Sequence, residues 1–109
     1  MVKIVAIVKK QPEQSREEFL HHWNVEHPAY VRELPGIRRY RQNPAITHRK
    51  EWPYDGMAEL WFDSVKDVAV AYAGPEAEAL FKHERLFLGS MEWFIADEVE
   101  IDLAVEARA

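Results

Sequence analysis

His27 and Tyr40 are the two residues of this sequence whose types and spacing best suit chemistry. His27 falls on an apolar helical stripe with Phe19, Trp23 and Val31, in which each step is four residues, or about one turn. A titratable ring that points the same way as Phe and Trp needs a polar partner or a task. Tyr40 follows thirteen residues later, in the next extended segment. A buried imidazole and a buried phenol can move protons without a metal or a cofactor.

Structural interpretations of the same residues stay open at this level. His27 could be a core histidine that donates to a backbone carbonyl freed by Pro28, which has no N–H. Tyr40 could be a strand aromatic that packs under the helix with its hydroxyl in water. His83 lies beside an apolar helical face, so it could line the same pocket or lie at the surface.

Three further residues complete the candidate substrate-binding set, with His83 as its fourth member. Arg38 alternates with Tyr40 along a strand and could bind a substrate carboxylate if both face one side. Trp23 could lie against a planar substrate, although core packing explains it as simply. Glu59 could be an inward carboxylate, or it could form an ion pair at a subunit contact.

Metal and nucleophilic sites are not expected. His22 and Glu26 are four residues apart on a helix, but His27 is five residues from His22, which points the two rings to different faces of an α-helix. No His-Glu-x-x-His motif is formed. A haem would have only His27 as its proximal ligand. The chain has no cysteine, which removes thiolate catalysis and zinc–thiolate sites, and its serines suit caps and turns.

The composition describes a small folded protein. The chain has 109 residues, 48% of them apolar, which suits one packed domain, expected over residues 1–102 with a tail over 103–109. The net charge is −5 without a concentrated basic face, so a nucleic-acid partner is not expected. No apolar stretch approaches the roughly 20 residues of a membrane span. A cytoplasmic protein is the default expectation.

The order of elements is strand, helix, strand, strand, helix, strand. Strands are expected over 2–9, 37–46, 56–62 and 92–101, and helices over 16–34, over 64–72 and after Gly74-Pro75. Ser15 and Glu18 form a capping box, and Pro28 should loosen the first helix. This is the split βαβ pattern of an α+β, ferredoxin-like fold with a four-stranded antiparallel sheet. Helices can cover one face of such a sheet, so its apolar open face predicts a face-to-face homodimer.

Several of these segments, in this order, resemble the EthD-like group of the dimeric α+β barrel superfamily. The matching pieces are the capping-box segment, the apolar stripe with its proline, and two later motifs, Leu34-Pro-Gly-Ile-Arg-Arg-Tyr40 and Glu59-Leu-Trp-Phe62. The C-terminal half, with Ala79 to Gly89, is similar to methylmuconolactone methylisomerase of the same superfamily. The resemblance covers residues 1 to 101.

The resemblance implies a cofactor-free site between the helices and the sheet of each subunit, with His27 and Tyr40 as proton carriers. The loop over 47–55 differs from that of the isomerase, so the same substrate is not implied. The expected function is isomerase- or lyase-type proton transfer on a lactone, an organic acid or an aromatic-derived catabolic intermediate. Two alternatives are a cofactorless or haem-dependent monooxygenase and a non-catalytic accessory or binding protein of a degradation pathway.

Overall fold

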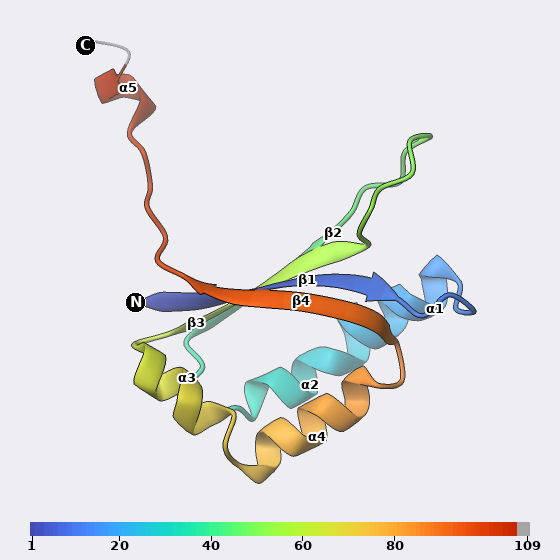
Figure 1. The fold of residues 1–109 in the computed structure, drawn as a ribbon, viewed down its shortest axis with the longest axis horizontal. Coiled ribbons are helices and arrows are strands. Elements are labelled where there is room, and N and C mark those ends of the chain that lie inside the picture. The colour runs from blue at the N-terminus through green and yellow to red at the C-terminus, as the bar shows by residue number, and fades with distance from the viewer. Residues whose placement is uncertain (107–109) are drawn as a thin grey trace.

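The computed structural model is a four-stranded antiparallel sheet with its layer of helices on one face (Figure 1). The strand order is β2-β3-β1-β4. The strands are β1 (Val2–Lys10), β2 (Arg39–Pro44), β3 (Gly56–Phe62) and β4 (Leu88–Ala96). The structure describes residues 1–106. This architecture confirms the ferredoxin-like α+β fold expected from the sequence.

The helical segments are α1 (Arg16–Leu20), the π-helical η1 (His21–Glu26), α2 (His27–Arg32), α3 (Val65–Ala71), α4 (Pro75–Glu84) and α5 (Leu103–Glu106). Those before β4 follow the expected order, whereas α5 lies in the segment expected as a C-terminal tail. Ser15 begins α1 with the predicted capping box, in which its hydroxyl accepts from the Glu18 amide and the Glu18 carboxylate accepts from the Ser15 amide. Among the described residues, no helix has the length and hydropathy needed to cross a membrane.

A wide turn lies directly before Pro28. The His27 amide donates to the His22 carbonyl, five residues back, which is the pattern of a π turn. Pro28 has no N–H and cannot continue an ordinary helical ladder, so the helix adapts by widening the turn that precedes it. The loosening expected at this proline is therefore present, and it has the form of the π turn η1.

Two strand boundaries differ from the expectation. β2 is shorter than the range 37–46 at both ends, and β4 begins four residues earlier and ends five residues earlier than the range 92–101. The early start arises because Leu88 pairs with Lys10 across a bulge, where Gly89 lies against the Lys10 carbonyl. Beyond Ala96 the chain leaves the sheet toward α5 (Figure 1). The last part of the expected tail, 107–109, lies outside the described residues.

The sheet has a covered face and an open face. The covered face carries the core side chains of β1 and β3, namely Ile4, Ala6, Val8, Ala58, Leu60 and Phe62. The stripe residues Phe19, Trp23, His27 and Val31 are all buried against this layer, as the four-residue spacing predicts. The open face, which no helix of residues 1–106 covers in Figure 1, carries the alternate positions Val5, Ile7, Met57, Trp61 and Phe94.

Gly56 lies where η1 approaches the sheet closely enough to leave no room for a Cβ. A Cβ at Gly56 would lie 2.6 Å from the Trp23 ring and 2.8 Å from the Asn43 carbonyl oxygen. Gly56→Ala should therefore lower the free energy of unfolding by about 1–3 kcal/mol, measured by urea denaturation. A Cβ at Gly74 would meet only the mobile carboxylate of Glu76, so Gly74→Ala is the matched control. Equal losses in the two variants would contradict this packing.

Candidate active site in the cavity between helices and sheet

A cavity of about 380 Å³ lies between the helices and the covered face of the sheet. Most of its lining is apolar and comes from β1, β3, β4 and the helices above them. Several lining residues are also exposed to solvent, so they mark its mouth on the β4 side. They are Val65, Phe81, Met91 and Trp93.

Four polar side chains reach into this apolar cavity: those of His27, Tyr40, Tyr72 and Glu84. Burial raises the pKa of the Tyr40 hydroxyl to about 12, and burial also raises the pKa of the Tyr72 hydroxyl well above its usual value. Both phenols therefore keep their protons at neutral pH. The cavity offers one imidazole, one carboxylate and two phenol donors to a ligand.

Tyr40 is oriented by the same helical distortion that precedes Pro28. In a π turn each carbonyl accepts from the N–H five residues later. The Trp23 carbonyl would therefore accept from residue 28, but Pro28 has no N–H. The Gln42 side-chain amide takes that place and donates to the Trp23 carbonyl at 2.6 Å. The same amide nitrogen donates to the Tyr40 hydroxyl at 2.7 Å, while Asn24 donates to the Gln42 side-chain oxygen. Because the Tyr40 oxygen accepts from Gln42, its own proton is available to an acceptor in the cavity.

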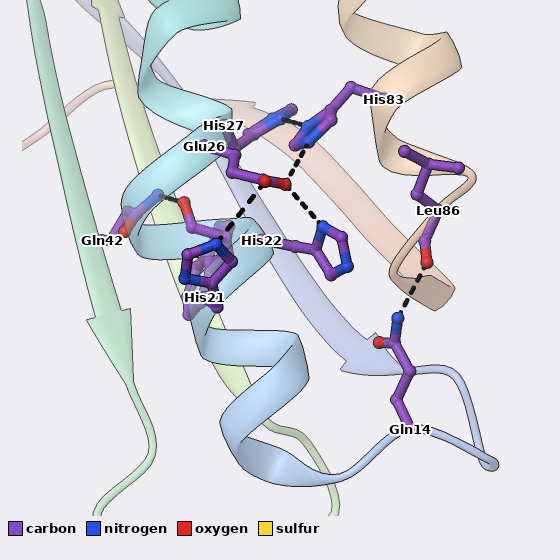
Figure 2. A network of polar contacts seen from close by, with 9 residues as sticks. Gln14, His21, His22, Glu26, His27, Gln42, His83 and Leu86 are labelled. Carbon is purple, nitrogen blue, oxygen red and sulfur yellow. Dashed lines mark hydrogen bonds and ion pairs between the residues drawn. The ribbon is translucent and has the colours of Figure 1, made fainter.

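His27 belongs to a chain of polar contacts that leads through His83 to exposed Glu26 (Figure 2). Its Nδ1 lies 2.9 Å from Nδ1 of His83, and the two rings are nearly parallel. His83 Nε2 lies 3.4 Å from a Glu26 carboxylate oxygen, which also contacts His22 Nδ1 at 2.7 Å. On the cavity side, His27 Nε2 lies 3.6 Å from Glu84 Oε2. The chain therefore joins a buried pair of imidazoles to a carboxylate at each end.

These contacts allow two arrangements of the protons when both rings are neutral. Burial lowers the pKa of His83, which favours its neutral form. The Nδ1–Nδ1 contact needs one donor, and each outer nitrogen faces a carboxylate: His83 Nε2 faces Glu26 at 3.4 Å, and His27 Nε2 faces Glu84 at 3.6 Å. With the His83 proton on Nε2, His83 Nδ1 accepts from His27 Nδ1–H, and His27 Nε2 has a free lone pair on the cavity side. The opposite arrangement puts the His83 proton on Nδ1 and the His27 proton on Nε2, facing Glu84. Glu84 is placed to stabilise the imidazolium that forms if His27 takes up a proton there.

The structure places the sequence candidates in three positions relative to the cavity. His27, Tyr40 and Trp23 line the cavity. His83 is buried directly behind His27, so it is neither in the lining nor at the surface. His27 does not donate to a carbonyl freed by Pro28, because its two ring nitrogens face His83 and Glu84.

Arg38 and Glu59 lie away from the cavity. Arg38 precedes β2 and pairs with Asp63 at 2.8 Å in solvent, because the strand begins only at Arg39. Glu59 lies on the open face, where it accepts from Lys3 Nζ at 2.7 Å. Of the two interpretations of Glu59, the inward carboxylate is wrong and an ion pair is present. A substrate carboxylate would therefore not meet Arg38 in this cavity.

Glu84 and Tyr72 are cavity residues that sequence reasoning missed. The signal for Glu84 was available, because it shares the helical spacing of Leu80 and Phe87, so α4 carries a carboxylate in its apolar stripe. Tyr72 follows the last residue of α3 and is the C-cap of that helix. Its position depends on how α3 turns into α4, which no local pattern fixes.

The same region contains a cluster that could hold a metal ion. One ligand atom from each of His22, Glu26 and His83 lies within 4.8 Å of the others. The sequence argument against a metal assumed that residues five apart point to different faces. That assumption is wrong here, because a π turn brings residues five apart back into line, and His22 and His27 both contact the ring of His83.

The fold and this cavity define a ferredoxin-like α+β protein with an apolar chamber between helices and sheet. Residues 11–90 match the model of the EthD domain, so the chain belongs to the EthD domain family. This confirms the resemblance to the EthD-like group that was drawn from the sequence. No curated protein matches the chain.

Three solved structures illustrate the similarity. An EthD family protein from Bacillus halodurans is 26% identical, with a TM-score of 0.77 over 91% of this chain and 99% of that chain. A dimeric protein of unknown function and ferredoxin-like fold from Bacteroides fragilis is 20% identical, with a TM-score of 0.69 over 89% and 95%. SnoaB, a cofactor-independent oxygenase from Streptomyces nogalater, is 14% identical, with a TM-score of 0.67 over 92% and 94%.

The buried Tyr40 hydroxyl predicts a specific alkaline response. An unfolded tyrosine ionises near pH 10, whereas folded Tyr40 ionises at about 12. A raised pKa contributes stability that is fully present below the unfolded value and is lost as pH rises through the folded one. Tyr40→Phe should therefore lose less stability than the wild type between these two pH values, in urea unfolding followed by fluorescence. Parallel losses in the two proteins would show that Tyr40 is not shielded from water.

Proposed function

We propose that this protein is a cofactor-independent enzyme that moves a proton on a small, largely apolar, oxygenated substrate. The proposal rests on one observation above all: His27, Tyr40 and Glu84 share an otherwise apolar cavity of about 380 Å³. That volume lies in the range of roughly 300–1,000 Å³ of small-molecule sites. The reaction class is isomerase- or lyase-type proton transfer, in a cytoplasmic catabolic setting.

His27 supplies the base. Its Nε2 lone pair takes a proton from the substrate and returns it to another atom, since an imidazole near neutrality can do both. The Glu84 carboxylate, 3.6 Å from Nε2, stabilises the positive ring between the two transfers. His83 holds the other nitrogen, which keeps the ring from rotating away from the substrate.

Tyr40 supplies the hydrogen-bond donor for a substrate oxygen. Its proton is free to donate because Gln42 occupies its oxygen, and burial keeps it protonated. A substrate carbonyl or carboxylate oxygen that gains negative charge during proton abstraction would accept this hydrogen bond. A lactone, a ketone or an aromatic-derived acid has such an oxygen next to an acidic proton.

Loss of the base should remove turnover. We expect the wild type to exchange an acidic C–H of lactones and aromatic-derived keto acids for deuterium in D₂O, measured by proton NMR. His27→Ala should slow this exchange by about 10²–10⁴-fold, the usual contribution of a positioned base. Glu84→Gln, which keeps the shape of the side chain, should slow it by roughly tenfold, the effect of about 1.4 kcal/mol on the barrier.

The control for these variants is His48→Ala, because His48 is exposed in the loop between β2 and β3. Exchange at the wild-type rate in His27→Ala would contradict the proposed base. Binding of the same compounds without exchange would favour a non-catalytic accessory protein. Consumption of oxygen when the enzyme is mixed with a substrate would favour the monooxygenase alternative. SnoaB, which has a similar fold, is described as a cofactor-independent oxygenase.

We also propose that the chain forms a homodimer through the open face of the sheet. Phe94 is 53% exposed there and pairs with Val5, and the charged pair Lys3–Glu59 flanks this apolar surface. An apolar patch of this kind on an uncovered sheet face is typical of a subunit contact. The similar structure from Bacteroides fragilis is described as dimeric.

A charge in the open face should separate the subunits. Phe94→Asp is expected to elute as a monomer in size-exclusion chromatography with light scattering, because burying an unpaired carboxylate is costly. Val70→Asp places the same charge at a similarly exposed position on α3 and should leave the dimer intact. A wild-type monomer, or a Phe94→Asp dimer, would contradict this interface.

A further inference from the structure

We propose that His22, Glu26 and His83 form a zinc-binding site on the outer side of η1 and α4. The three residues gather beside the buried imidazole pair, as Figure 2 shows for the contacts that converge on the Glu26 carboxylate. Nothing in the activity proposed above requires this site. It is carried by the positions and the chemistry of these three side chains.

The distances suit a zinc ion after small side-chain movements. Zinc–ligand bonds of about 2.0–2.1 Å with tetrahedral angles place ligand atoms about 3.3 Å apart. Glu26 Oε1 lies 3.4 Å from His83 Nε2 and 2.7 Å from His22 Nδ1, and the three ligand atoms all lie within 4.8 Å of one another. Glu26 is exposed and His22 is half-buried, so both can adjust around the fixed ring of His83.

The donor set selects the metal. Two imidazoles and one carboxylate, with a position left for water, are typical zinc ligands, whereas calcium and magnesium prefer oxygen ligands alone. His21 Nε2 lies 3.5 Å from the second oxygen of Glu26, so another imidazole is within reach of the same carboxylate. A glutamate carboxylate is ionised at neutral pH, as a zinc ligand must be.

His83 connects this site to the cavity. Its Nε2 would bind the metal, while its Nδ1 contacts Nδ1 of His27 at 2.9 Å. A nitrogen that binds zinc has no proton, so the proton of His83 must then lie on Nδ1 and be donated to His27. The His27 proton moves to Nε2 in consequence, and the lone pair on the cavity side is lost. Bound zinc would therefore hold His27 in the form that cannot act as a base.

Titration calorimetry of the purified full chain with Zn²⁺ at neutral pH tests the site directly. We expect saturable binding of one ion by each chain. His22→Ala and Glu26→Gln should each weaken binding by at least the roughly 10–100-fold that loss of an outer-shell partner costs in known zinc sites. Both positions are accessible, so the two variants should keep the fold, which circular dichroism checks. His48→Ala is the matched control, since it removes an exposed histidine far along the chain from all three ligands.

The absence of saturable binding, or wild-type affinity in both ligand variants, would overturn the zinc site. The link to the cavity has its own measurement, the ¹⁵N chemical shifts of the His27 ring. Saturation with Zn²⁺ should move the His27 proton from Nδ1 to Nε2 in the wild type, and the same zinc concentration should leave His22→Ala unchanged. Binding without this change would overturn the link. Because neither readout uses a substrate, failure here is distinct from failure of the proposed enzyme.

Discussion

The missing N–H of Pro28 is the constraint on which the arrangement of the site depends. It ends the ordinary hydrogen-bond ladder of the first helical segment and leaves the Trp23 carbonyl without its backbone partner. A buried carbonyl needs a donor, and Gln42 on β2 supplies it. The same amide then holds the Tyr40 hydroxyl. The missing N–H on the helix thereby fixes, through Gln42, the orientation of the Tyr40 hydroxyl on β2.

The π turn has a second consequence for the histidines. By widening the turn it brings His22 and His27 to the same side, where both contact the ring of His83 on α4. The His83 ring is also stacked on Tyr30, with centroids 4.5 Å apart, and this packing limits its rotation. The result is an ordered path of polar contacts from exposed Glu26 to His27 in the cavity. Such extended networks specify one arrangement only when every member has a partner.

Much of the fold could be predicted from local patterns. The capping box at Ser15, the run of apolar residues in β1 and the four-residue stripe all describe single elements, and each is present as expected. The strand boundaries of β4 were less accessible, because its start depends on a bulge against Lys10 rather than on its own composition.

Only part of the candidate site could be predicted from the sequence. His27 and Tyr40 were found because a polar ring in an apolar stripe and a strand aromatic have local signals. The contact of His27 with His83 joins residues 56 positions apart, and it needs both the π turn and the docking of α4. Arg38 was misplaced by simple alternation, since the strand begins after it. Tertiary contacts, rather than residue types, decide these positions.

The position of the His27 proton tests the central claim most directly. The proposed base needs that proton on Nδ1, donated to His83, with the His83 proton facing Glu26, so that Nε2 is free in the cavity. Long-range ¹H–¹⁵N correlation of the histidine rings, in metal-free protein at neutral pH, reports which nitrogen carries it. We expect the Nδ1–H form of His27. A His27 ring protonated on Nε2 alone would contradict its role as the base.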